Sequence, residues 1–305
     1  MSNPREAYGK ALAEAARKDP RIWALDADLC RSTMSCHMER EFPDRYVEAG
    51  IAEANMVGMA AGLALCGKIP FASTFAVFMT GRAFDQIRQS ICIPRLNVKI
   101  CGSSAGLSDY GDGSTHQSVE DIAIMRALPN MTVLSPGDAR QTGAAVKAAA
   151  AWDGPVYLRV TRGELDDLPG DGSFEIGRVY PLTEGRDITI LATGSMAGRA
   201  LCAARILQEA GISALVANVP TIKPLDAAAI HALAARTGRV LTCEEHSVIG
   251  GLGSAVAEAL ATSGIPVHIM GIEDTFGMSS NSELALLEKY RLTWQSIAEK
   301  VRTLV

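Results

Sequence analysis

The chain has 305 residues, of which 48% are hydrophobic, 21% charged and 5% aromatic, and its formal net charge is −5. This composition is typical of a folded protein large enough for two domains, and it excludes a disordered or fibrous chain. The acidic balance, without a basic patch, argues against nucleic acid as the main partner, and no apolar run is long enough to predict a membrane span.

Seven cysteines are scattered along the chain, and they form neither a CxxC pair nor a zinc-like spacing. We therefore expect reduced thiols in a cytoplasmic protein. The first residues also lack the basic-then-apolar pattern of a signal peptide.

The first half of the chain alternates β-rich runs with helical stretches. The expected helices include 81–93 and 139–151, and the expected strands are 22–25, 69–75, 97–101, 131–134 and 156–160. Strands that alternate with helices predict a parallel, doubly wound sheet.

A change in composition marks the middle of the chain. Residues 166–186 contain a proline, several glycines and a group of acids, which is typical of a linker. Beyond them the alternation restarts, with expected strands at 188–192, 214–219, 240–242 and 267–270. We therefore predict an α/β fold of two doubly wound domains, at 1–165 and 187–305, joined by that linker.

The most informative segment is 47–62, where Glu53 stands at the start of an apolar, glycine-spaced helix. A carboxylate in such apolar surroundings can share a proton with a bound base, although an acidic residue in a first helical turn is also favoured by the helix dipole. The run Gly-Ile-Ala-Glu-x-Asn-x-x-Gly-x-Ala resembles the pyrimidine-binding segment of transketolase-type thiamine diphosphate enzymes. The resemblance implies that Glu53 holds the aminopyrimidine of thiamine diphosphate in its imino form, so that the cofactor activates itself.

Two phenylalanines follow an expected strand in the run Ser73-Thr74-Phe75-Ala76-Val77-Phe78. Taken alone, they would be interpreted as core residues. The resemblance to transketolase implies instead that Phe78 stacks on the aminopyrimidine and that Phe75 lines the same pocket, a contact worth about 0.5–1.5 kcal/mol beyond area burial. The next aromatic residue of the family is replaced by Gly81, and the following Arg-Ala-Phe-Asp-Gln is similar to deoxyxylulose phosphate synthases.

A glycine-rich loop at 111–120 holds Asp112 and His116 four residues apart, so both side chains can reach the opening of the same site. Histidine titrates near neutrality and suits proton transfer to or from a hydroxyl group; the alternative is a surface turn before a helix. The loop resembles the transketolase motif Asp-Gly-x-[Ser/Thr]-His-Gln. That resemblance implies that His116 handles the hydroxyl protons of the donor sugar and that Asp112 binds the 2-hydroxyl of the ketose.

Three further positions match transketolase residues that bind the sugar phosphate, namely Arg5, Ser32 and Arg162. A guanidinium fork suits phosphate because it pairs with two oxygens at once. The same resemblance assigns Asp28 to the cofactor site.

The chain also departs from the family at two places in this region. Ser104 stands where the family has a phosphate-binding histidine, and Asp109-Tyr110-Gly111 replaces the more usual Val-Gly-Glu. These departures bear on which sugar the protein accepts.

The chain carries two Gly-Asp-Gly triplets, at 111 and 170. The magnesium and diphosphate motif of thiamine enzymes needs such a triplet after a strand and an asparagine pair about thirty residues later, which together cage a hard cation. Neither triplet is followed by that pair. We therefore expect no metal site here, and we expect a partner subunit to hold Mg²⁺ and the diphosphate.

In the second half, residues 243–253 resemble the Glu-x-His-x-x-x-Gly-Gly-Leu-Gly signature of the transketolase C-terminal domain, in which we interpret His246 as structural. The resemblance thus covers nearly the whole chain and is to the C-terminal half of transketolase. It implies the small subunit of a split transketolase, acting in a heterotetramer of two subunits of each kind. The implied reaction is transfer of a two-carbon ketol unit between sugar phosphates.

Three alternatives stay open from the sequence. The protein could be a specialised transketolase for a branched sugar phosphate such as apulose 4-phosphate, or for a sulfosugar. It could be the beta subunit of a 2-oxo-acid dehydrogenase, which has the same two domains but which the Asp112–Gln117 motif disfavours. It could also be a non-catalytic subunit with a relic pocket, which the joint presence of Glu53, Phe78, Asp112 and His116 argues against.

Overall fold

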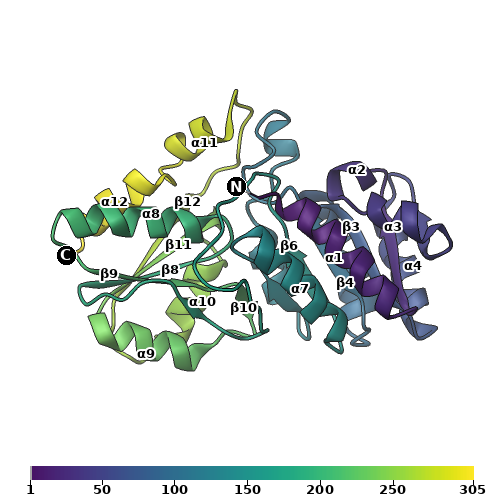
Figure 1. The fold of residues 1–305 in the computed structure, drawn as a ribbon, viewed down its shortest axis with the longest axis horizontal. Helices are drawn as coiled ribbons and strands as arrows, with labels where there is room; N and C mark the ends of the chain where they lie inside the picture. The colour runs from purple at the N-terminus through teal and green to yellow at the C-terminus, as the bar shows by residue number, and fades with distance from the viewer. Residues whose placement is uncertain (1) are drawn as a thin grey trace.

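A computed structural model describes residues 2–305 and contains two β-sheets. The first sheet has seven strands in the order β10-β5-β6-β4-β3-β1-β2 and occupies the right half of Figure 1. Six strands run parallel: β1 (Ile22–Asp26), β2 (Tyr46–Glu48), β3 (Ile69–Phe75), β4 (Lys99–Ser103), β5 (Thr132–Leu134) and β6 (Val156–Arg159). The seventh, β10 (Thr221–Lys223), comes from the second half of the chain and pairs antiparallel with β5.

Helices cover both faces of this sheet. One face packs against α1 (Pro4–Lys18) and α7 (Ala139–Ala151), which lie side by side in Figure 1. The other packs against α4 (Glu53–Leu65) and α6 (Asp121–Ala127). Because successive side chains of a strand point to opposite faces, Phe71 of β3 joins the first layer and Ala72 the second. Short helices α2 (Cys30–Thr33), α3 (Cys36–Glu41) and η1 (Pro43–Arg45) follow β1.

The helix expected at 81–93 is not a single regular helix. Two π-helical segments, η2 (Phe78–Arg82) and η3 (Ile87–Cys92), flank the short α5 (Phe84–Gln86). A π-turn accommodates an extra residue in a helix and is frequent at functional sites. Here the first π-segment begins at Phe78, three residues after β3 ends at Phe75.

The second sheet has the order β12-β11-β8-β9-β7 and lies in the left half of Figure 1. Its strands are β7 (Tyr180–Pro181), β8 (Ile188–Ala192), β9 (Ala214–Asn218), β11 (Val240–Ser247) and β12 (Val267–Ile272), and only β7 is antiparallel to its neighbour. The helices α8 (Met196–Glu209) and α12 (Trp294–Arg302) cover one face, whereas α9 (Ala227–Thr237) and α10 (Leu252–Ala259) cover the other. The helix α11 (Glu283–Lys289) precedes α12. The predicted α/β fold with two wound sheets is therefore confirmed.

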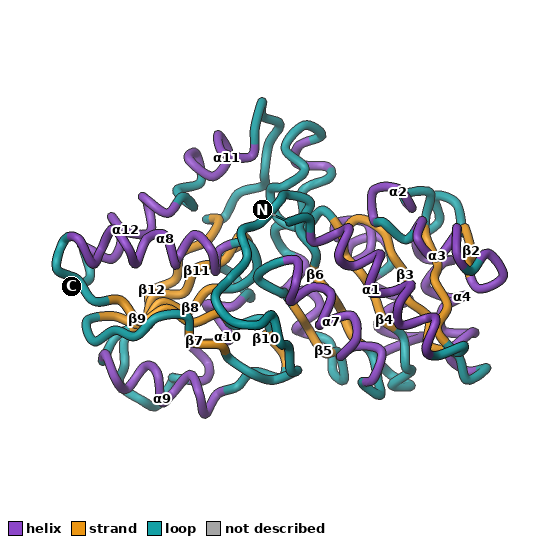
Figure 2. The backbone as a smooth tube through the Cα atoms, viewed as in Figure 1, coloured by secondary structure: helices purple, strands orange, loops and turns teal. Residues whose placement is uncertain are grey.

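The two halves share more than a linker. Residues 166–186 include β7, which belongs to the second sheet, and β10 crosses over to the edge of the first sheet. One apolar cluster also contains buried residues of both halves, such as Met131 and Leu191. Figure 2 shows the long loops that run between the two sheets. The domains therefore form one continuous body.

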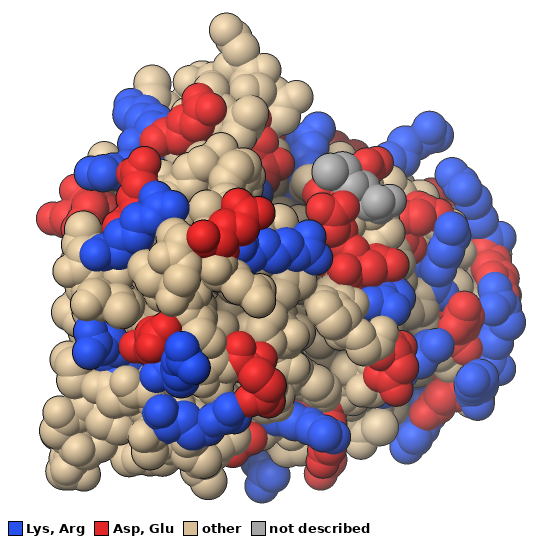
Figure 3. All heavy atoms as spheres, turned by 60° about the vertical axis from the view of Figure 1, so that its left-hand side comes forward, with Lys and Arg blue, Asp and Glu red and all other residues tan. Residues whose placement is uncertain are grey.

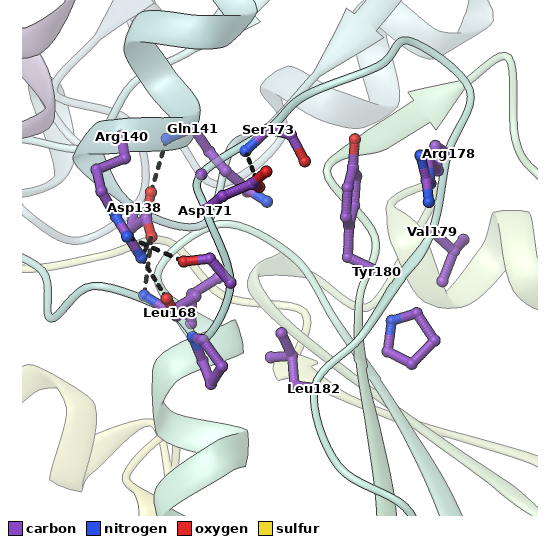
Figure 4. A pocket seen from close by; sticks show the side chains of 14 residues that line it. Asp138, Arg140, Gln141, Leu168, Asp171, Ser173, Arg178, Val179, Tyr180 and Leu182 are labelled. Atoms are coloured by element: carbon purple, nitrogen blue, oxygen red, sulfur yellow. Dashed lines mark hydrogen bonds and ion pairs between the residues drawn. The ribbon is translucent and has the colours of Figure 1, made fainter.

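The linker is also tied to α7 around a cavity shown in Figure 4. Asp138 caps α7 by accepting a hydrogen bond from the amide of Gln141 at 2.7 Å, and its other oxygen accepts one from the amide of Leu168 at 2.8 Å. Arg140 donates to the carbonyl of Gly170 at 3.1 Å. Since these groups hold the linker to the first domain, we interpret this cavity as part of the domain junction.

Charged side chains are interspersed on the face shown in Figure 3, where lysine and arginine alternate with aspartate and glutamate. Mixed charge of this kind produces no extended field of one sign. Within residues 2–305, no helix is both long and apolar enough to cross a membrane.

Candidate active site

Glu53 is the first residue of α4 and is almost completely buried, with 1% of its surface exposed. No side chain caps this helix, so the amides of its first turn and the helix dipole favour a carboxylate at that position. Both carboxylate oxygens accept hydrogen bonds from Nη1 of Arg82, at 2.9 Å and 2.7 Å. The structure therefore holds a buried, ion-paired carboxylate at the predicted position.

An aromatic wall lies beside this carboxylate. The rings of Phe75 and Phe78 are nearly parallel, with centroids 6.0 Å apart, and His116 meets Phe78 edge-on at 5.2 Å. The guanidinium of Arg82 lies over the Phe78 ring, 5.0 Å from its centroid, so the wall and Glu53 are adjacent. Four residues from three separate segments of the sequence thus converge: Glu53, Phe75, Phe78 and His116.

The loop that carries Asp112 and His116 is supported by the second domain. The side-chain amide of Gln117 donates to the carbonyls of Asp109 and Met278, at 3.2 Å and 3.0 Å. The amide of Ser280 donates to the carbonyl of Tyr110 at 2.8 Å. The loop and residues 277–280 approach each other so closely that two positions require glycine. A Cβ at Gly113, where φ is +77°, would collide with Ser279, and a Cβ at Gly277 would collide with Gln117.

His116 has one ring nitrogen engaged within the loop. Its Nδ1 lies 2.9 Å from the hydroxyl of Thr115, whereas Nε2 makes no hydrogen bond to any residue that the structure describes. The ring is only partly buried, and Asp112, on the same loop, is exposed. A histidine with one anchored and one open nitrogen can exchange a proton with a bound hydroxyl group.

The three residues predicted to grip phosphate are brought together. Arg5 donates to the carbonyl of Ser32 at 3.0 Å. Burial lowers the pKa of Arg5, and the neighbouring charge of Arg162 lowers it further. Arg5 Nε is buried and has no hydrogen-bond partner among residues 2–305. Asn3 caps α1 and so fixes the first turn, on which Arg5 lies.

One of these arginines already has an internal counter-ion. Nη1 of Arg162 lies 2.8 Å from Oδ2 of Asp109, a carboxylate that is 3% exposed. Burial raises the pKa of Asp109, with Arg162 opposing the rise and Asp112 adding to it. The residue that departs from the family pattern therefore offsets one positive charge of the predicted phosphate site.

The other departure lies at a strained position. Ser104 directly follows β4, is completely buried and has a positive φ of 52°, which a non-glycine residue adopts rarely. Its hydroxyl has no hydrogen-bond partner within the described part of the chain. Strain and unsatisfied polar groups of this kind concentrate at functional sites.

Asp28 makes no hydrogen bond or ring contact with these groups within residues 2–305. Asp28 is exposed. Its backbone amide and that of Gly50 both donate hydrogen bonds to Oε1 of Glu48, each at 2.8 Å. The loop around it is fixed by Asp26, which accepts hydrogen bonds from Thr33, Ser35 and the amide of Leu29. Burial raises the pKa of Asp26 to about 6.

His246 is completely buried at the junction of the domains. Its Nε2 accepts a hydrogen bond from the amide of Ala123 at 3.2 Å, so Nδ1 carries the proton and donates to the carbonyl of Ser247 at 2.7 Å. Burial lowers the pKa of His246, which favours this neutral form. The contacts are those of a structural residue.

The groups present fit an aminopyrimidine. A buried carboxylate can bind a ring nitrogen, and the adjacent aromatic wall offers a face for stacking. Among residues 2–305, no group of three or more His, Cys, Asp or Glu side chains is arranged to hold a metal ion.

Comparisons with known proteins agree with this architecture. Residues 2–167 match the transketolase pyrimidine-binding domain, and residues 177–297 match the transketolase C-terminal domain. The chain belongs to the transketolase family.

Three relatives illustrate the similarity. The 6-deoxy-6-sulfo-D-fructose transketolase subunit SqwH of Clostridium sp. is 44% identical over 96% of this chain and 91% of its own length. One of the subunits of the apulose-4-phosphate transketolase of Phocaeicola vulgatus is 40% identical over 91% of this chain and 90% of its own. A solved structure described as a split gene transketolase, inactive beta4 tetramer, is 49% identical with a TM-score of 0.90, and the match covers 99% of this chain and 97% of that one.

Proposed function

We propose that this chain is the small subunit of a split, thiamine diphosphate-dependent transketolase that transfers a two-carbon ketol unit between sugar phosphates. The observation that carries the proposal is the convergence of buried Glu53 with Phe75, Phe78 and His116. When bound, thiamine diphosphate supplies the carbanion chemistry, which no amino-acid side chain provides.

The residues of the chain supply orientation and proton control. Glu53 binds the ring nitrogen of the aminopyrimidine and shares a proton with it, while Phe78 and Phe75 fix the plane of that ring. His116 exchanges protons with the sugar hydroxyls, and Asp112 orients the ketose through its 2-hydroxyl. Arg5, Ser32 and Arg162 bind the anionic end of the sugar, and Asp28 contributes to the cofactor site.

The remaining half of the cofactor site is assigned to a separate subunit. That partner would hold Mg²⁺ and the diphosphate, because neither Gly-Asp-Gly triplet of this chain is followed by the asparagine pair that completes the cage. Two subunits of each kind would form a heterotetramer. A cytoplasmic location is supported by the cysteines, all seven of which are free thiols.

Reconstitution tests this proposal. The isolated chain is expected to show no ketol transfer and only weak thiamine diphosphate binding, whereas addition of the partner subunit should produce transfer from a ketose phosphate to an aldose phosphate. A coupled assay with an acyl acceptor in place of the aldose should show no product. Full activity of the isolated chain would exclude the split-subunit assignment, and acyl transfer would favour the 2-oxo-acid dehydrogenase alternative.

A second candidate is a transketolase for a sulfonated sugar. It is favoured by the ion pair between Asp109 and Arg162, because a site with one compensated arginine suits a singly charged sulfonate better than a doubly charged phosphate. The similarity to the sulfo-fructose subunit supports it as well. In the reconstituted enzyme, the ratio of kcat/KM for sulfonated and phosphorylated ketose donors distinguishes the two candidates.

Replacing Arg162 by alanine is expected to raise KM for phosphorylated sugars far more than it changes kcat. Phosphate is bound far from the reacting carbon, so the lost interaction is largely uniform between ground and transition states. Losing one charge-assisted pair costs about 1.5–3 kcal/mol, or about one to two decades in kcat/KM. Glycolaldehyde, which has no phosphate, should be nearly unaffected as an acceptor.

The control for this variant follows from the ion pair. Arg162→Ala alone leaves the buried carboxylate of Asp109 unpaired, so thermal stability should fall. The double variant with Asp109→Asn should regain stability without regaining phosphate affinity. An equal loss with phosphorylated and unphosphorylated acceptors would show that Arg162 is structural.

A further inference from the structure

One side chain covers both surfaces that the proposed aminopyrimidine would use. Arg82 closes the π-segment η2 four residues after Phe78, so the two side chains lie on the same side of the helix. Its Nη1 contacts both oxygens of Glu53, at 2.9 Å and 2.7 Å, and its guanidinium carbon lies 5.0 Å from the centre of the Phe78 ring. Arg82 therefore contacts the carboxylate and the ring that are assigned to the aminopyrimidine.

The pairing has a physical cause in the unloaded chain. A buried carboxylate without a partner is strongly unfavourable, and Glu53 is 1% exposed. Arg82 supplies the missing charge, and its guanidinium gains a cation–π contact on Phe78. The arginine side chain itself is 52% exposed, so it can turn out into solvent without moving the backbone.

We propose that Arg82 is the resident counter-ion of Glu53, which holds the carboxylate and the Phe78 ring in place before loading and leaves both when the aminopyrimidine binds. This inference rests on the proposed function, because it concerns the same pyrimidine site. The ion pair between Arg82 and Glu53 must break before the pyrimidine binds, and this costs free energy. The affinity of the wild-type chain for the pyrimidine is therefore lower than it would be without that ion pair. Arg82 is thus a positioning residue for Glu53.

The proposal predicts that removal of the guanidinium strengthens pyrimidine binding. The probe is the hydroxymethyl aminopyrimidine half of thiamine, which lacks the thiazolium and the diphosphate, titrated calorimetrically into the full chain. Arg82→Met should bind this probe about tenfold more tightly than the wild type, which corresponds to the loss of one charge-assisted pair that must otherwise be broken. Arg82→Lys, which keeps the charge but not the planar fork, should lie between the two.

Two controls keep the result interpretable. Arg88→Met removes an exposed arginine of η3 whose side chain has no hydrogen bond or ion pair within the described residues 2–305, and it should bind the probe like the wild type. Without ligand, Arg82→Met should melt at a lower temperature than Arg88→Met, since only the former leaves a buried carboxylate unpaired. If Arg82→Met does not fold, the comparison of Arg82→Lys with the wild type still gives the direction of the effect.

The outcomes separate this inference from the proposed function. If the wild type binds the probe, Glu53→Gln abolishes binding and the Arg82 variants bind no more tightly than the wild type, the pyrimidine site stands and the competition is overturned. Tighter binding by both Arg82→Met and Glu53→Gln would also overturn it, since the carboxylate would then not be the shared contact. If no variant binds the probe, alone or with the partner subunit, both the site and the competition at it are refuted.

Discussion

Glu53→Gln is expected to reduce ketol transfer by about 10³-fold or more in the assembled enzyme while leaving the fold intact. The amide has nearly the same shape as the carboxylate and can still accept a hydrogen bond from Arg82 through its oxygen, so the first turn of α4 should persist. An amide cannot share a proton with the ring nitrogen of the aminopyrimidine, however. The loss should therefore fall on kcat with every donor sugar.

The decisive measurement is hydrogen–deuterium exchange at carbon 2 of the bound cofactor. This exchange precedes any contact with sugar, so it reports the action of Glu53 alone, and it should slow by orders of magnitude in Glu53→Gln. Asp85→Asn, which changes an exposed carboxylate on the neighbouring α5, is the matched control and should exchange like the wild type. Wild-type exchange in Glu53→Gln would mean that another group activates the cofactor.

Much of the fold was predictable because its elements are locally encoded. The bounds of β3 and α7 agree with those expected from the sequence. A buried parallel strand is mostly apolar, and an alanine-rich helix after an aspartate cap is favoured by local propensity. The motifs around Glu53, Phe78 and His116 were also recognisable, through their resemblance to transketolase sequences. The structure adds that they meet at one place.

Other features depended on contacts between distant segments. The strand β10 is only three residues long and forms because the edge of β5 is available, which nothing in its own sequence indicates. Arg82 was recognisable from the sequence as the first residue of the run Arg-Ala-Phe-Asp-Gln. The pairing of Arg82 with Glu53, however, depends on the π-turns that interrupt the expected helix. The support of the His116 loop by residues 277–280 likewise arises only from the packing of the second domain on the first.

His116 offers a test that is complementary to Glu53, because the two residues are assigned different protons. His116→Phe keeps a ring edge-on to Phe78 but cannot exchange a proton with a sugar hydroxyl. Proton transfer by a positioned side chain contributes about 10²–10⁴-fold, so kcat/KM should fall within that range for donor and acceptor alike. His116→Asn, which loses the ring but keeps a polar group, separates the effect of packing from that of proton transfer.

Exchange at carbon 2 should continue at the wild-type rate in His116→Phe, since Glu53 and the aromatic wall are untouched. Pre-steady-state measurement would then locate the block after cofactor activation, at the step in which the donor hydroxyl loses its proton. If exchange slows together with turnover, His116 acts in cofactor activation and not on the sugar. If turnover is unchanged, a different group accepts the hydroxyl proton, and Asp112 becomes the residue to replace next, because its carboxylate is exposed on the same loop, four residues before His116.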